Sequence, residues 1–135
     1  MGTRRHARIF AFQALYAWEE SHSDTQELLA MTWLDKEPGE NERTFASLLI
    51  SGTLENLHEI DRTIQLNLNT WTLDRLSRLD LAILRMSTFA LLYQRDVPAN
   101  VTINEAVEIA KQFGSFESYR FVNGVLDGIL KATLS

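Results

Sequence analysis

The chain has 135 residues, of which 45% are hydrophobic, and its formal net charge is −5. This length and apolar content suffice for one ordinary domain with its own core, so we expect a single domain over residues 1–135. The chain has no cysteine, which excludes disulfides and thiolate metal sites, and its three histidines lack ligand spacing. We therefore predict neither a metal nor another cofactor.

Neither the N-terminus nor the most apolar segment indicates export or a membrane span. The N-terminus is basic but lacks an apolar run followed by a small-residue cleavage site. Leu81 to Tyr93 contains a single charge and is shorter than the roughly 20 residues that a bilayer span needs. We expect a cytoplasmic protein without a membrane partner, in which Leu81 to Tyr93 forms a buried central helix.

An all-α fold is predicted, because no hairpin turn joins alternating segments and both prolines lie in polar connectors. The predicted helices cover Arg4 to Glu20, Asp24 to Leu34, Glu42 to Leu66, Leu73 to Arg78, Asp80 to Gln94, Ile103 to Phe113 and Phe116 to Ala132. Thr102 followed by Glu105 matches a capping box, and Gly114 stands where a C-terminal cap is expected. The Pro-Gly loop Asp35 to Asn41 separates a two-helix N-terminal part from a larger bundle.

Acidic residues are concentrated in one segment of the chain. Glu19 to Glu42 holds eight of them against Lys36 alone, a charge of −7 that leaves +2 for the remainder. Because binding of a polyanion depends on local rather than summed charge, the negative total does not argue against such a partner.

The first predicted helix joins arginines to aromatic residues on one side. Steps of about 100° place the following residues on one arc, expected to face the core: Ala7, Ala11, Ala14, Leu15 and Trp18. The neighbouring arc holds Arg4, Arg5, Arg8, Phe12 and Tyr16. Arginine forks suit phosphate oxygens and aromatic rings stack on bases, a combination typical of single-stranded RNA binding. The alternative is a solvated helix end with Tyr16 in the core, although cations at a helix N-terminus oppose its dipole.

Arg85 is the only charge between Leu81 and Tyr93. It either pairs with an acid such as Asp80 or Asp96, or points into a polar surface groove. We favour pairing.

Asn123 and Gly124 lie in the middle of the last predicted helix, although both are poor helix formers. Close helix packing or a capped break is the favoured explanation. The alternative is that Gly124 lets a ligand or partner approach the backbone beside Arg120.

Taken together, five segments of the chain resemble the NusB family of bacterial transcription antitermination factors. In chain order they read "RRHAR", "QALYAWE", "LDLAILR", "VPANVTINEAVEIAKQFG" and "FVNGVLD". The resemblance spans nearly the whole chain, and the two C-terminal motifs are its most specific part. It implies about seven helices in two small helical subdomains of one compact domain, an N-terminal part over about 1–66 and a C-terminal bundle over about 72–133.

The resemblance also implies a function without catalysis. Members bind the boxA element of ribosomal RNA leader transcripts together with ribosomal protein NusE, and the pair nucleates a complex with other Nus factors on RNA polymerase. The implied RNA-binding residues are Arg4, Arg5, Arg8, Tyr16, Arg85, Glu117, Arg120 and Phe121. Asp80 matches an acidic position associated with the NusE side.

Four residues depart from the family's usual pattern. Ile9 stands where many members have an acid, Ala90 replaces a common glutamate, Arg120 replaces lysine, and Phe116 replaces a polar residue. Ile9 and Phe116 make the expected RNA surface more apolar.

Two other functions remain as alternatives. One is the NusB-like RNA-binding domain fused to ribosomal RNA cytosine methyltransferases, although no methyl-donor glycine loop or strand-rich extension follows in this chain. The other is a small all-helical enzyme whose arginines clamp a dicarboxylate substrate. No catalytic pair with supporting spacing favours that enzyme.

Overall fold

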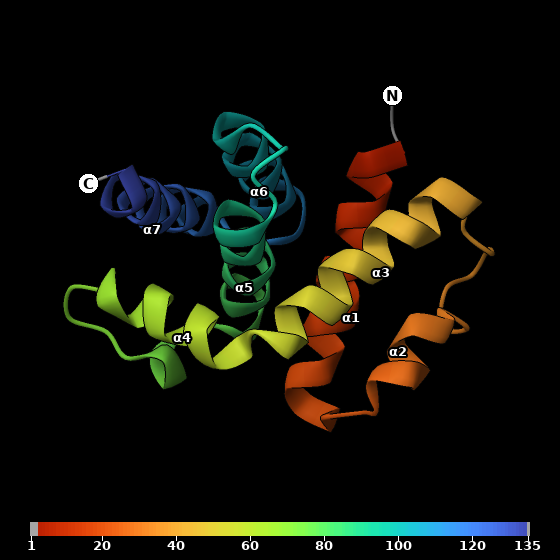
Figure 1. Cartoon of the computed structure of the whole chain (residues 1–135). Helices are drawn as coiled ribbons and strands as arrows, with labels where there is room; N and C mark the ends of the chain where they lie inside the picture. The colour runs from red at the N-terminus through yellow and green to blue at the C-terminus, as the bar shows by residue number, and fades with distance from the viewer. Residues whose placement is uncertain (1–2, 135) are drawn as a thin grey trace.

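The structure, a computed structural model, describes residues 3–134, and every regular element in that range is helical. The elements are α1 (Thr3–Ser21), α2 (Thr25–Ala30), α3 (Glu40–Glu55), α4 (Leu57–Leu66), the 3₁₀ turn η1 (Leu73–Arg75), α5 (Arg78–Tyr93), α6 (Ala99–Phe113) and α7 (Phe116–Leu134). In Figure 1, α5 lies at the centre, with α6 above it, α7 and α4 on the left, and α1 and α3 on the right. The predicted all-α fold is confirmed.

Helix α5 is the centre of the domain. All residues from Leu81 to Leu91 are buried, and α5 contacts α1, α3, α4, α6 and α7. A helix that is buried all round must be surrounded by other elements, and this one is. Its start is fixed by Ser77, whose Oγ accepts a hydrogen bond from the Asp80 N–H at 3.1 Å. No helix within residues 3–134 has both the length and the apolar character needed to cross a membrane.

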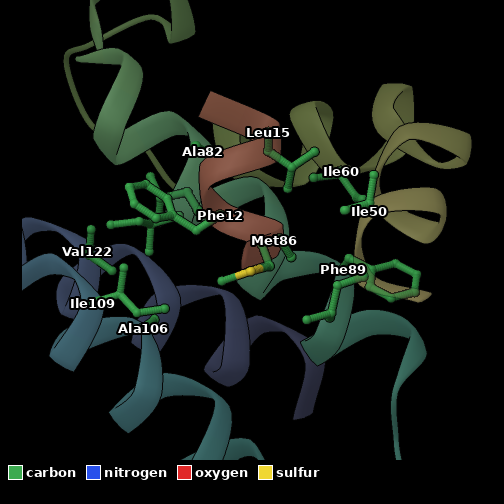
Figure 2. Close-up of a cluster of buried hydrophobic side chains, with 14 of the residues drawn as sticks. Phe12, Leu15, Ile50, Ile60, Ala82, Met86, Phe89, Ala106, Ile109 and Val122 are labelled. Carbon is green, nitrogen blue, oxygen red and sulfur yellow. The ribbon is translucent and has the colours of Figure 1, made fainter. Parts of the chain in front are cut away.

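Side chains from five helices meet those of α5 to form the core. Figure 2 shows Phe12 and Leu15 of α1 close to residues of α3, α4, α5, α6 and α7. The core stripe expected for α1 is largely confirmed, since Ala7, Ala11, Ala14 and Leu15 are buried and Trp18 packs partly against them. The arrangement fixes α1 against α5 and so determines which side of α1 faces solvent.

The long helix predicted from Glu42 to Leu66 is two helices, α3 and α4, because the chain turns at Asn56. The Asn56 side chain donates a hydrogen bond to the Gly52 carbonyl at 2.8 Å, the acceptor that its own backbone N–H also uses. Asparagine readily competes for backbone groups in this way, which ends a helix.

The start predicted for the sixth helix is also wrong. Helix α6 begins at Ala99 with Pro98 as its N-cap, so Thr102 lies inside the helix and is buried. Proline suits a helix start because it lacks the N–H that would otherwise be unsatisfied there. At the other end Gly114 is the C-cap, as predicted, and its N–H bonds the Ala110 carbonyl at 2.8 Å.

Gly52 of α3 lies directly against the ring of Phe89 in α5. A Cβ atom added there would overlap the ring of Phe89. We therefore expect Gly52→Ala to destabilise the domain by about 1–3 kcal/mol, the usual cost of overpacking a core, in urea unfolding followed by circular dichroism. Gly124→Ala is the matched control, because its Cβ would meet nothing within 4 Å. Equal midpoints for Gly52→Ala and the unmodified protein would contradict this packing.

Candidate nucleic-acid interface

The three N-terminal arginines of α1 divide between two neighbouring helices. Arg4 and Arg8 place their guanidinium carbons 4.6 and 5.2 Å from the centroid of the Phe45 ring in α3. Arg5 turns to α6, where Nε and Nη2 donate to the two carboxylate oxygens of Glu105 at 3.0 and 2.8 Å. The cluster is therefore held by protein groups on both flanks.

Arg8 is buried, with 8% of its surface exposed, and Phe12 of the same arc is buried too. Loss of water around the guanidinium lowers the pKa of Arg8. The expectation of one exposed arc from Arg4 to Tyr16 is wrong for these two residues, because α3 and α6 cover that side of α1. Arg4 and Arg5 remain exposed.

Glu105 pairs with Arg5 across the groove between α1 and α6 and does not cap α6, contrary to the prediction. Hydrogen bonding to Arg5 holds the pKa of the Glu105 carboxyl below its ordinary value and raises the pKa of Arg5. Ile9 lines the same groove and packs partly against the core. The apolar residue at position 9 is thus used in packing.

Arg85 pairs with acids, as favoured, but its partners are Asp61 and Glu19 instead of Asp80 or Asp96. Its Nε and Nη2 donate to the two oxygens of Asp61 at 2.9 and 3.0 Å, and Nη1 donates to Glu19. The hydrogen bonds to these carboxylates raise its pKa although burial opposes them. The guanidinium joins α1, α4 and α5 inside the domain.

Beyond the arginine cluster, cations alternate with aromatic rings along α1, α5, α6 and α7. We name this set the cation–aromatic surface, and it consists of Tyr16, Arg78, Lys111, Phe113, Phe116, Tyr119 and Arg120. Arg78 lies 5.1 Å from the Tyr16 ring, Lys111 lies 5.1 Å from Tyr119, and Arg120 lies 5.4 Å from Phe116. Such pairs leave ring faces and cations together at the surface, which is what stacking and phosphate binding require.

Tyr16 is 39% exposed and Phe116 is 66% exposed. The exposure of Tyr16 agrees with the surface role inferred for it from the sequence. The Phe12 ring lies between Tyr16 and Phe113, with ring centroids 6.2 and 5.3 Å away. A buried phenylalanine thus supports two rings that reach solvent.

Asp80, Glu117 and Phe121 come together in a surface pocket of about 320 Å³ between the start of α5 and the start of α7. We name it the Asp80 pocket. Burial raises the pKa of the Asp80 carboxyl, against a smaller opposing effect of Ser118 and Ser77. The residue associated with NusE therefore shares one pocket with two residues associated with RNA.

Sequence reasoning missed two residues of this region. Trp71 lines the same pocket, and Arg78 covers Tyr16. A tryptophan in the polar segment between two predicted helices was the available signal for the first. The second depends on how α5 crosses α1, which no local pattern contains. Within residues 3–134 no group of three His, Asp or Glu side chains could hold a metal ion.

A small helical domain whose arginines lie against exposed aromatic rings is typical of helical RNA-binding proteins. The NusB family model matches residues 5–131 of the chain. The chain belongs to the NusB family.

Known relatives agree with that assignment. The transcription antitermination protein NusB of Treponema pallidum is 48% identical over 131 residues, which cover 96% of this chain and 93% of that protein. The structure of NusB from T. maritima matches with a TM-score of 0.86 at 42% identity, covering 95% of this chain and 90% of that one. A crystal structure of antitermination factors NusB and NusE in complex with double-stranded RNA matches with a TM-score of 0.83 at 25% identity, covering 98% of this chain and 98% of that one.

A double-mutant cycle measures what the Arg85 pair contributes. Alanine at Arg85, at Asp61 and at both should give a coupling energy of about 1–3 kcal/mol in urea unfolding, because the arginine is buried and bonded to both carboxylate oxygens. Arg62 and Glu59 form the matched control, an exposed pair on α4 at 3.3 Å, with an expected coupling of about 0.5 kcal/mol or less. Equal coupling in the two cycles would show that Arg85 does not act as a structural tie.

Proposed function

We propose that this protein is a transcription antitermination factor that binds boxA-type RNA of ribosomal RNA leader transcripts together with ribosomal protein NusE. The observation that carries the proposal is the cation–aromatic surface, whose Lys111 lines one groove with the exposed Arg5. Arg4 is exposed one residue before Arg5. Membership of the NusB family and the similar structure of NusB with NusE and RNA support it. The protein acts by binding, without catalysis.

Different residues of this surface bind different parts of the RNA. Arg4 and Arg5 supply donors for phosphate oxygens, and Tyr16 supplies a ring for a base. Arg5 exchanges the carboxylate of Glu105 for a phosphate when RNA binds, which lowers the net gain from that contact. Glu117, Arg120 and Phe121 extend the RNA surface to α7. Because Arg8 and Arg85 are buried, we assign them the role of supporting α1 from within.

The protein partners follow from the same proposal. NusE binds beside the Asp80 pocket, so that it and the RNA share one edge of the domain. The assembled pair joins RNA polymerase and other Nus factors in the cytoplasm, where transcripts are made.

Replacing Arg4 and Arg5 by alanine tests the RNA assignment. Binding of a boxA oligonucleotide should weaken, and the negative slope of log affinity against log salt should become shallower by about 1.4, since each phosphate contact on a single strand contributes about −0.7. Arg62→Ala on α4 is the control for loss of an exposed arginine away from α1 and should leave the slope unchanged. Arg8 is left intact because its burial would mix binding with stability. Unchanged affinity in Arg4→Ala/Arg5→Ala would remove α1 from the interface.

The role of NusE is tested by titrating boxA RNA with and without it. If the two proteins share one RNA surface, NusE lowers the dissociation constant, and RNA tightens NusE binding by the same factor. Asp80→Asn should weaken the NusE effect while RNA binding to the protein alone persists. Identical dissociation constants with and without NusE would refute cooperation.

A further inference from the structure

Trp71 is a large exposed ring on a fixed piece of backbone. It lies between α4 and η1 and is 51% exposed. Gln65 holds the backbone around it: its amide nitrogen donates to the Trp71 carbonyl at 3.0 Å and its amide oxygen accepts from the Leu73 N–H at 3.1 Å. A ring held this way loses little conformational entropy when a ligand covers it.

Trp71 and Phe121 together form a wall between two neighbouring pockets. On one side is the Asp80 pocket, which is lined by two acidic side chains, Asp80 and Glu117, and by Arg75. On the other is a pocket of about 360 Å³ between residues 67–71 and α7, whose one charged lining residue is Arg120. Asn67, Asn69 and Thr70 provide its polar groups. We name this second pocket the Trp71 pocket.

Gly124 forms part of the wall of the Trp71 pocket. A Cβ added there would meet nothing within 4 Å, so close helix packing does not explain this glycine. A glycine inside a helix lowers its stability relative to alanine, and here no neighbour in the domain requires it. The absence of a side chain leaves the helix backbone open to a ligand beside Arg120.

We infer that the Trp71 pocket binds one base of the RNA, stacked on Trp71 and Phe121, with Arg120 at the adjoining phosphate. The inference rests on the proposed RNA-binding function and names a site within it. Two ring faces, side-chain amides and a cation without an acid in the lining suit a nucleotide. The Asp80 pocket on the other side of Trp71 holds two acids against one cation, Arg75, and is less suited to a phosphate.

The intrinsic fluorescence of Trp71 gives a direct test. Trp18→Phe/Trp33→Phe leaves Trp71 as the only tryptophan, and stacking of a base on it should quench its emission as a boxA oligonucleotide is added. Trp18→Phe/Trp71→Phe leaves Trp33 as a reporter outside the pocket. Trp33 follows α2, and its Nε1 donates to the Leu28 carbonyl within that helix. We expect no change in its emission.

Two binding variants separate stacking from charge. Trp71→Ala should lower the affinity for the boxA oligonucleotide by roughly five-fold or more, because stacking is lost. The slope of log affinity against log salt should not change, because no cation is removed. Gly124→Leu should also lower this affinity, because its side chain fills the pocket. It should not lower the unfolding temperature, since leucine is a good helix former.

Each contrary result identifies what fails. If RNA binds with normal affinity to Trp71→Ala and Gly124→Leu, and Trp71 emission is constant, the base site is refuted while the proposed function stands. If NusE and not RNA changes Trp71 emission, the pocket is a protein interface. If no RNA binds to the unmodified protein under any condition, the proposed function and the base site are both overturned.

Discussion

The structure depends on the burial of α5. Its eleven consecutive buried residues can be covered only if helices from both ends of the chain surround it. That requirement places α1 and α3 on one side and α6 and α7 on the other, as in Figure 1. It also buries a charge within α5, because Arg85 lies inside the apolar run. A buried guanidinium needs carboxylates, and Asp61 and Glu19 meet that need.

Pairing within the core has an effect at the surface. Arg85 attaches the last turns of α1 to α4 and α5, which leaves Tyr16 exposed beneath Arg78. At the other end of α1, Phe45 and Glu105 hold the arginines. The groups that we propose to face RNA are therefore positioned before any ligand arrives. Binding at these groups would require exchange of partners more than ordering of side chains.

Local patterns in the sequence predicted the features that depend on helical periodicity. These include the helical class, the buried segment Leu81 to Tyr93 and the core stripe of α1. They failed where a distant element decides the outcome. Arg8 is buried because α3 covers it. The turn at Asn56 is a local exception, since the Asn56 side chain bonds the carbonyl four residues earlier and competes with the helix. The partners of Arg85 lie 24 and 66 residues away in the sequence, beyond the reach of any spacing argument.

The contact between Gly52 and Phe89 has a consequence across the family. The Phe89 ring packs directly on the α3 backbone here because Gly52 has no side chain. A larger residue at the first position is compatible with this crossing only if the second becomes smaller. Sequences that keep the same helix crossing should therefore change the two positions together, and the pair should stand out as a covarying contact between the third and fifth helices.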